Sequence, residues 1–105
     1  MERNFKMTMH VPLGRRSGKL CLREEKGTLG GTLEVLGSKG DFTGTLTADG
    51  LLDFTGKMTS LLRSFFYRAT GRITGHSLEL AVKGDRYSFR ITGEEMDAGN
   101  TEAMS

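Results

Sequence analysis

Apolar and polar residues alternate along almost the whole chain. The segment Ser77–Lys83, for example, places an apolar side chain at every second position from Leu78 to Val82. Strict alternation is typical of a β-strand that buries one face, whereas an amphipathic helix repeats its apolar positions every three to four residues. Eight such runs follow one another: Asn4–Val11, Lys19–Glu25, Thr28–Leu36, Asp41–Thr47, Leu51–Thr59, Phe65–Thr74, Ser77–Lys83 and Arg86–Gly93. The pattern predicts an all-β protein.

Short connections between these runs predict antiparallel neighbours. Glycine occurs in most of them and supplies the positive φ that tight hairpin turns require. The expected connections are Pro12–Gly18, Lys26-Gly27, Gly37–Gly40, Ala48–Gly50, Ser60–Ser64, Gly75-His76 and Gly84-Asp85. Of these, only Pro12–Gly18 and Ser60–Ser64 are longer than four residues, so we expect them to be the long loops.

All eight runs share an apolar face that must be buried. Sequential antiparallel strands bury such a face by closing into a barrel, which also removes the open sheet edges. We therefore predict one domain over residues 1–93, an eight-stranded antiparallel up-and-down barrel. Residues 5–46 echo residues 54–91, which favours two four-stranded repeats. Residues 94–105 are acidic, small and aperiodic, and are predicted to form a disordered acidic C-terminal tail.

Several glycines fall on the apolar face beside large side chains. The expected neighbours are Leu33 and Phe54 for Gly44, Phe42 and Tyr67 for Gly56, Leu22 and Leu46 for Gly31, and Leu52 and Leu80 for Gly71. Small residues beside large ones fill a narrow barrel. The same missing side chains could instead leave room for one small ligand. A filled interior and a ligand cavity are both open alternatives.

Composition narrows the classes of function. Lys and Arg number 15 against 13 Asp and Glu, a net charge of +2 that argues against nucleic acid as a partner. No apolar run approaches the roughly 20 residues of a membrane-spanning helix. The single cysteine, Cys21, and the absence of an apolar leader predict a cytoplasmic protein. His10 and His76 have no carboxylate or cysteine at ligand spacing, so we predict no metal, no cofactor and no catalytic residues.

Alternate connections of an up-and-down barrel share one end, and both long loops fall at the same end. This end is predicted to be an open mouth with basic residues above an apolar interior, an arrangement that suits a ligand with an anionic head and an apolar body. The predicted head-group residues are Arg15, Arg16, Lys39 and Arg63, and the predicted body-lining residues are Met58, Phe65 and Tyr67. We therefore predict non-enzymatic binding of a small apolar or amphipathic molecule.

Two other functions compete with this prediction. The first is a structural or protein-interaction module with a packed core, which forms a homodimer through its mouth loops or a sheet face. The second is a small-barrel enzyme, for which Tyr67 and Tyr87 are the inward hydroxyl groups. On the outer face, Glu79 is expected between Arg72 and Arg90 in a cross-strand charge row.

The chain resembles the small calycin-like barrels, the lipocalin-like and avidin-like architecture, and a group of short bacterial domains of unknown function. The resemblance covers about residues 4–93. It is carried by Val11-Pro12-Leu13-Gly14, Ser60-Leu61-Leu62-Arg63 and three Thr-Gly phrases that begin at Thr43, Thr55 and Thr70. It implies a binding module.

Overall fold

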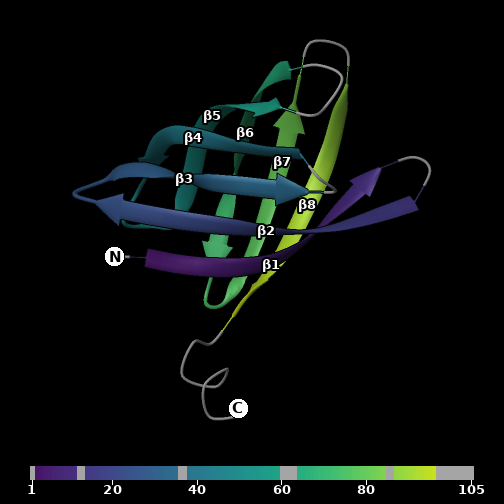
Figure 1. Cartoon of the computed structure of the whole chain (residues 1–105). Coiled ribbons are helices and arrows are strands. Elements are labelled where there is room, and N and C mark those ends of the chain that lie inside the picture. The colour runs from purple at the N-terminus through teal and green to yellow at the C-terminus, as the bar shows by residue number, and fades with distance from the viewer. Residues whose placement is uncertain (1, 12–13, 36–37, 60–63, 85–86, 97–105) are drawn as a thin grey trace, which may run out of the picture.

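A computed structural model describes residues 2–11, 14–35, 38–59, 64–84 and 87–96, except the side chain of Phe65. It contains eight strands and no helix in these residues (Figure 1). The strands are β1 (Glu2–Val11), β2 (Gly14–Glu25), β3 (Thr28–Val35), β4 (Ser38–Leu46), β5 (Leu51–Thr59), β6 (Ser64–Thr74), β7 (Ser77–Lys83) and β8 (Ser88–Glu95). Glu94 and Glu95, which the sequence assigned to the tail, thus lie in β8.

The strands form a closed antiparallel barrel in sequence order. Each strand pairs with its neighbours along the chain, and β1 closes the ring against β8 from Phe5 opposite Glu95 to His10 opposite Arg90. In Figure 1, β1, β2 and β3 run roughly horizontally, whereas β6, β7 and β8 run steeply between the top and the bottom of the picture. The predicted all-β, eight-stranded up-and-down barrel is confirmed.

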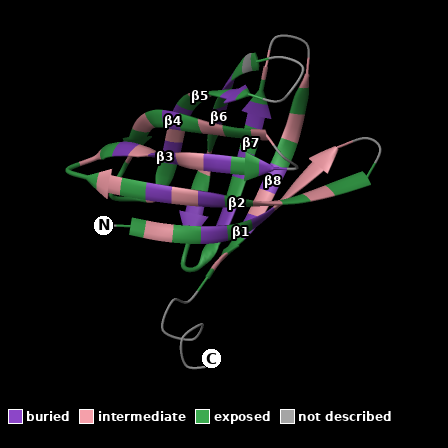
Figure 2. Cartoon of the chain, viewed as in Figure 1, coloured by how far each residue is buried: buried purple, intermediate pink, exposed green. Residues whose placement is uncertain are grey.

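The alternating apolar side chains meet inside this ring. Along β7, buried and exposed residues alternate without a break, and the same banding is visible on most strands in Figure 2. The fully buried large side chains are Phe5, Met7, Leu20, Leu22, Leu29, Phe42, Phe54, Leu80 and Ile91. No charged or polar residue is buried in the described part of the chain. Burial of apolar surface, at roughly 25 cal/mol per Å², is therefore the main source of stability.

The pairing of β3 with β4 differs from the expected register. Val35 lies opposite Ser38, so the predicted four-residue connection Gly37–Gly40 is wrong and Gly31 lies opposite Phe42 instead of Leu46. Gly40 belongs to β4, where it lies opposite Leu33. The residue is a glycine because the carbonyl oxygen of Lys57 occupies the space that a side chain at this position would need. This glycine serves a close strand approach, whereas the sequence suggested a loop.

The shift is four residues long, so the inward face of β4 is unchanged, since side chains alternate with a period of two. Gly44 consequently lies beside Leu29 and Phe54, and the expected Leu33 neighbour is wrong. The predicted pairs around Gly56, with Phe42 and Tyr67, are confirmed. Those around Gly71, with Leu52 and Leu80, are also confirmed.

The first predicted long loop, Pro12–Gly18, is wrong for most of its length. β2 begins at Gly14, and Gly14–Ser17 pair with β1 from Val11 back to Thr8. This stretch extends past the first residue pair of β2 with β3, Gly18 opposite Val35, and pairs with β1 alone among the described strands; we call it the β1–β2 ribbon (Figure 1). Its β2 residues, Gly14–Ser17, are exposed or half-buried and carry no alternating apolar side chains, which explains why the pattern did not reveal it.

Candidate functional site

The two ends of the barrel are different. The turn end carries the connections at residues 26–27, 47–50 and 75–76, all of which the structure describes as short turns. The three-residue loop predicted at Ala48–Gly50 is confirmed, because the Thr47 amide donates to the Leu51 carbonyl across it. The opposite end, called the mouth end here, carries connections 12–13, 36–37, 60–63 and 85–86, which lie outside the described residues.

Arg3 and Glu95 form an ion pair at the turn end. The Arg3 guanidinium donates two hydrogen bonds to the Glu95 carboxylate, at 2.9 and 2.6 Å, and a third to the Gly75 carbonyl at 2.8 Å. The guanidinium also lies 5.4 Å from the Phe5 ring centre, and the His76 ring lies 2.9 Å from the same carboxylate. These contacts, first of all the hydrogen bond from Arg3, lower the pKa of Glu95 to about 2. The turn end thus carries an ion pair over an aromatic ring, beside a hollow of about 510 Å³ whose lining includes Arg3, Gly27 and Gly75.

This ion pair makes stability depend on pH. Folding lowers the pKa of Glu95 from its ordinary 4.5 to about 2. The stability that the ionised carboxylate contributes is therefore complete above pH 4.5 and is lost as the pH falls toward 2. We expect the Glu95→Gln variant to lose about 2 kcal/mol at pH 7 and to show a flatter decline in stability between pH 5 and pH 2. Urea unfolding across this range measures both effects.

Glu94→Gln is the matched control, since Glu94 is exposed on the other face of the same strand. It should retain the full acid dependence of the wild type. An unchanged decline in the Glu95→Gln variant would show that the ion pair does not contribute.

A groove of about 950 Å³ opens on the other side of the barrel, toward the mouth end. We call it the mouth groove. It is lined by Asp41, Phe42, Thr43, Thr55, Gly56, Lys57, Ser64, Phe66, Tyr67, Lys83, Gly84 and Tyr87. These residues come from β4, β5 and β6, the end of β7 and the connection between β7 and β8, so neighbouring strands of the barrel form the groove.

Two aromatic residues of the groove lining, Phe42 and Tyr67, pack against the buried ring of Phe54. Phe42 stacks on Phe54 with ring centres 4.1 Å apart, and Tyr67 meets Phe54 edge-on at 6.3 Å. Tyr67 extends over Gly56, where a β-carbon would lie only 2.6 Å from its hydroxyl oxygen. Gly56 therefore leaves the space that the tyrosine occupies, as expected for a small residue paired with a large one.

The hydroxyl group of Tyr67 is buried without a hydrogen-bond partner among the described residues. The residue as a whole is 5% exposed. Burial raises the pKa of this phenol well above its ordinary value of 10, so the group is neutral and can donate a hydrogen bond. A buried polar group that loses water and gains no partner is destabilising by about 1–3 kcal/mol.

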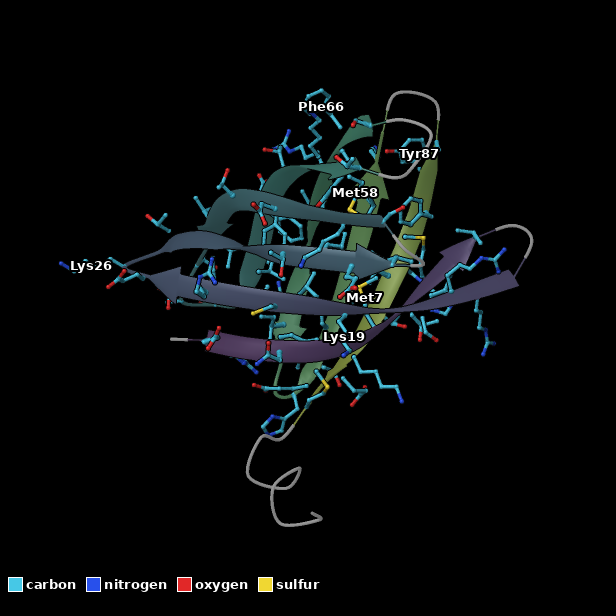
Figure 3. The ribbon with its side chains drawn as sticks, viewed as in Figure 1. Met7, Lys19, Lys26, Met58, Phe66 and Tyr87 are labelled. Carbon is cyan, nitrogen blue, oxygen red and sulfur yellow. The ribbon has the colours of Figure 1, made fainter. Side chains whose placement is uncertain are left out.

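The rim of the groove is aromatic and basic. Tyr87 stacks on Phe89 at 5.7 Å and donates a hydrogen bond from its hydroxyl to the Phe66 carbonyl at 3.3 Å. The Phe66 ring is 72% exposed, and the Lys57 ammonium lies 5.7 Å from its centre. Figure 3 shows Phe66 and Tyr87 at the same end of the barrel, with Met58 further inside.

The structure brings few of the predicted ligand-binding residues together. Only Tyr67 lines the mouth groove, while Met58 is buried in the core. The predicted loop position of Arg15 and Arg16 is wrong, because both lie in the β1–β2 ribbon, and the Arg16 guanidinium donates to the Arg15 carbonyl at 3.1 Å. Lys39, also expected in a loop, lies on β4 opposite Glu34 and Thr59. Arg63 and the side chain of Phe65 lie outside the described residues.

The predicted charge row on the outer face is confirmed in one half only. Glu79 lies opposite Arg72, but its other neighbour is Thr92, and Arg90 lies opposite Ala81. The β7–β8 pairing is two residues out of the expected register, because Lys83 pairs with Ser88. Arg68 on the same face donates two hydrogen bonds to Asp53, at 3.0 and 2.7 Å, which lower the pKa of this carboxyl.

His10 and Cys21 each contact one neighbouring polar side chain. His10 contacts the Thr92 hydroxyl at 2.9 Å, and the Cys21 thiol donates to Glu2 at 3.6 Å. Burial, followed by this contact with Glu2, raises the pKa of Cys21, which keeps it a thiol. Within the described ranges, no group of three His, Cys, Asp or Glu residues could hold a metal ion. The described residues also form no helix long and apolar enough to cross a membrane.

Comparisons with protein-family models, with curated proteins and with solved structures give no match for this chain. The fold assignment therefore rests on topology. Eight sequential antiparallel strands close into one ring, which is compatible with a calycin-like architecture.

Proposed function

We propose that the protein binds a small amphipathic molecule in the mouth groove, as a binding module and not as an enzyme. The observation that carries this proposal is Tyr67, a residue of the groove lining whose hydroxyl is buried without a partner among the described residues. A few polar groups converging on an apolar concave surface are typical of small-molecule sites. Tyr87 and Phe66 offer apolar surface, and the ammonium groups of Lys57 and Lys83 are exposed at the edge.

The position of this site differs from the site predicted from sequence. The basic residues now proposed for the rim are Lys57 and Lys83, in place of Arg15, Arg16 and Lys39. A calycin-like relationship, a bacterial source and a cytoplasmic location belong to the proposal as well. The closed eight-stranded topology supports the first of these, and the other two rest on the sequence resemblance and on the single cysteine.

We expect the neutral dye phenylnaphthylamine to bind with a saturable rise in fluorescence at one dye per chain. The Ser64→Trp variant should weaken this binding at least tenfold, because Ser64 lines the groove and the indole ring would fill it. Ser77→Trp is the matched control. Both serines are exposed first residues of their strands, and each contacts a neighbouring polar side chain, but Ser77 lies at the turn end. Absence of saturable binding, or equal loss in both variants, would refute the proposed site.

Self-association is the second candidate function, and Phe66 favours it. Its phenyl ring is 72% exposed on the outer face of β6 and offers apolar surface to a second copy, although one residue is far smaller than a contact patch of several hundred Å². If Phe66 lies in a dimer contact, sedimentation at high protein concentration should detect a dimer that the Phe66→Ser variant loses. A strict monomer would exclude this function.

A further inference from the structure

We infer that the ligand of the mouth groove is an aromatic anion, and that the Tyr67 hydroxyl donates a hydrogen bond to its charged oxygen. This inference rests on the proposed function and names the class of molecule bound. It also assigns Tyr67 as the residue that determines specificity.

The first argument concerns the state of the phenol. Tyr67 is kept neutral by burial, so its hydroxyl supplies one donor hydrogen. No described residue accepts that hydrogen. The ligand must therefore bring the acceptor, and a charged oxygen forms the stronger hydrogen bond with a neutral donor.

The second argument concerns the space beside the hydroxyl. Gly56 has no side chain, and the Tyr67 hydroxyl lies 2.6 Å from the point that a β-carbon of Gly56 would occupy. Both residues belong to the lining of the groove. The Tyr67 ring fills this space, which places its hydroxyl against Gly56, a second residue of the lining.

The third argument concerns charge. Lys57 and Lys83 contribute two positive charges to the described lining, and Asp41 contributes one negative charge. Arg68, which is close in sequence to Tyr67, is already paired with Asp53. The groove therefore carries a net positive charge, which attracts an anion and opposes a cation.

The fourth argument concerns the body of the ligand. Tyr87, which is half-buried in the lining, and Phe66, which is 72% exposed at the rim, offer accessible ring surface, whereas Phe42 and Tyr67 are buried behind them. Flat π-surfaces favour stacked or edge-on contacts with other rings. Small aromatic carboxylates and sulfonates combine such a ring with an anionic oxygen.

Two dyes with the same ring skeleton test the inference. Anilinonaphthalene sulfonate carries one sulfonate group that phenylnaphthylamine lacks. We expect the sulfonate dye to bind at least tenfold more tightly to the wild-type protein. The Tyr67→Phe variant should weaken its binding about tenfold or more, because a hydrogen bond to a charged group is lost, while binding of the neutral dye changes less than about twofold.

Tyr87→Phe is the matched control, because the Tyr87 hydroxyl already donates to the Phe66 carbonyl. It should change the affinity of either dye by less than about threefold. The Lys57→Gln, Lys83→Gln double variant should weaken the sulfonate dye and reduce the salt dependence of its binding. Tyr67→Phe is expected to fold at least as well as the wild type, since it removes an unsatisfied polar group.

The possible results separate the two proposals. Equal affinity for both dyes, or an unchanged affinity of Tyr67→Phe for the sulfonate dye, would overturn the inference and leave the proposed function standing. Failure of both dyes to bind would overturn the proposed function and the inference together. Selective loss of the sulfonate dye in Tyr67→Phe would support both.

Discussion

The Gly31→Ala variant should lose about 3 kcal/mol of stability, whereas Gly30→Ala should be unchanged or slightly more stable. The two glycines are neighbours on β3 and face opposite sides of the barrel wall. A β-carbon at Gly31 would overlap the Cys21 carbonyl oxygen and lie 2.8 Å from the tip of the Phe42 ring. Overpacking against a well-packed interior is destabilising by about 1–3 kcal/mol, and a backbone atom that cannot rotate away favours the upper value.

Gly30 has the opposite environment. The nearest atom to a β-carbon there is the Phe42 carbonyl oxygen at 3.8 Å, which is an ordinary contact distance. Replacement of a glycine by alanine at a tolerant position stabilises a protein by about 0.4–1 kcal/mol, because the unfolded chain loses freedom. Urea unfolding of the two variants should therefore shift the midpoint in opposite directions. Similar losses of stability in both variants would mean that Gly30 and Gly31 have equally crowded surroundings, and the inferred difference between the two faces of β3 would be wrong.

The fold could be predicted because alternation determines which face of a strand is buried. The errors at β3–β4 and β7–β8 are shifts of four and two residues, and an even shift leaves every side chain on its own face. The inward face of the barrel was therefore predictable even where the pairing was not. The pairing depends on close contacts between distant strands, such as the approach of the Lys57 carbonyl to Gly40, which no local pattern reveals.

The candidate site was less predictable than the fold. Tyr67 was identified because it shares the inward face of β6 with Ala69 and Ile73. Lys57, Phe66 and Lys83 were missed as site residues because they are exposed residues at outward positions of their strands, whereas the search considered loops and inward side chains. A loop-based search also placed Arg15 and Arg16 at the mouth, although they lie on a strand.

Arg3 and Glu95 could have been identified from the alternation of inward and outward residues along their strands. Arg3 is two residues before Phe5, and Glu95 is two residues after Gly93, so both point to the inside of the barrel. Two opposite charges at inward positions of neighbouring strands, next to the chain ends, indicate a closing ion pair. The error was to end the eighth strand at Gly93.

The aromatic cluster links the core to the mouth groove. Phe54 is buried between Phe42 and Tyr67, and both of these also line the groove. A change in the core at Phe54 would therefore alter the walls of the proposed site as well as the stability of the barrel.

The Phe54→Ala variant should lose about 3–5 kcal/mol, because it removes a fully buried ring and leaves a cavity. The stacked contact with Phe42 at 4.1 Å and the edge contact with Tyr67 at 6.3 Å are lost together. Since small domains are stable by only about 5–15 kcal/mol, this one substitution removes a large share of the total. Thermal and urea unfolding, followed by circular dichroism, measure the loss.

Phe66→Ala is the matched control for the same chemical change on the surface. Phe66 is 72% exposed and contacts the Lys57 ammonium, so its removal should reduce stability by less than about 1 kcal/mol. Phe54→Leu, which retains most of the buried volume, should fall between the two variants. If Phe54→Ala were no less stable than Phe66→Ala, the ring of Phe54 would not be part of a packed interior. The conclusion that a packed aromatic interior supports the walls of the mouth groove would then be wrong.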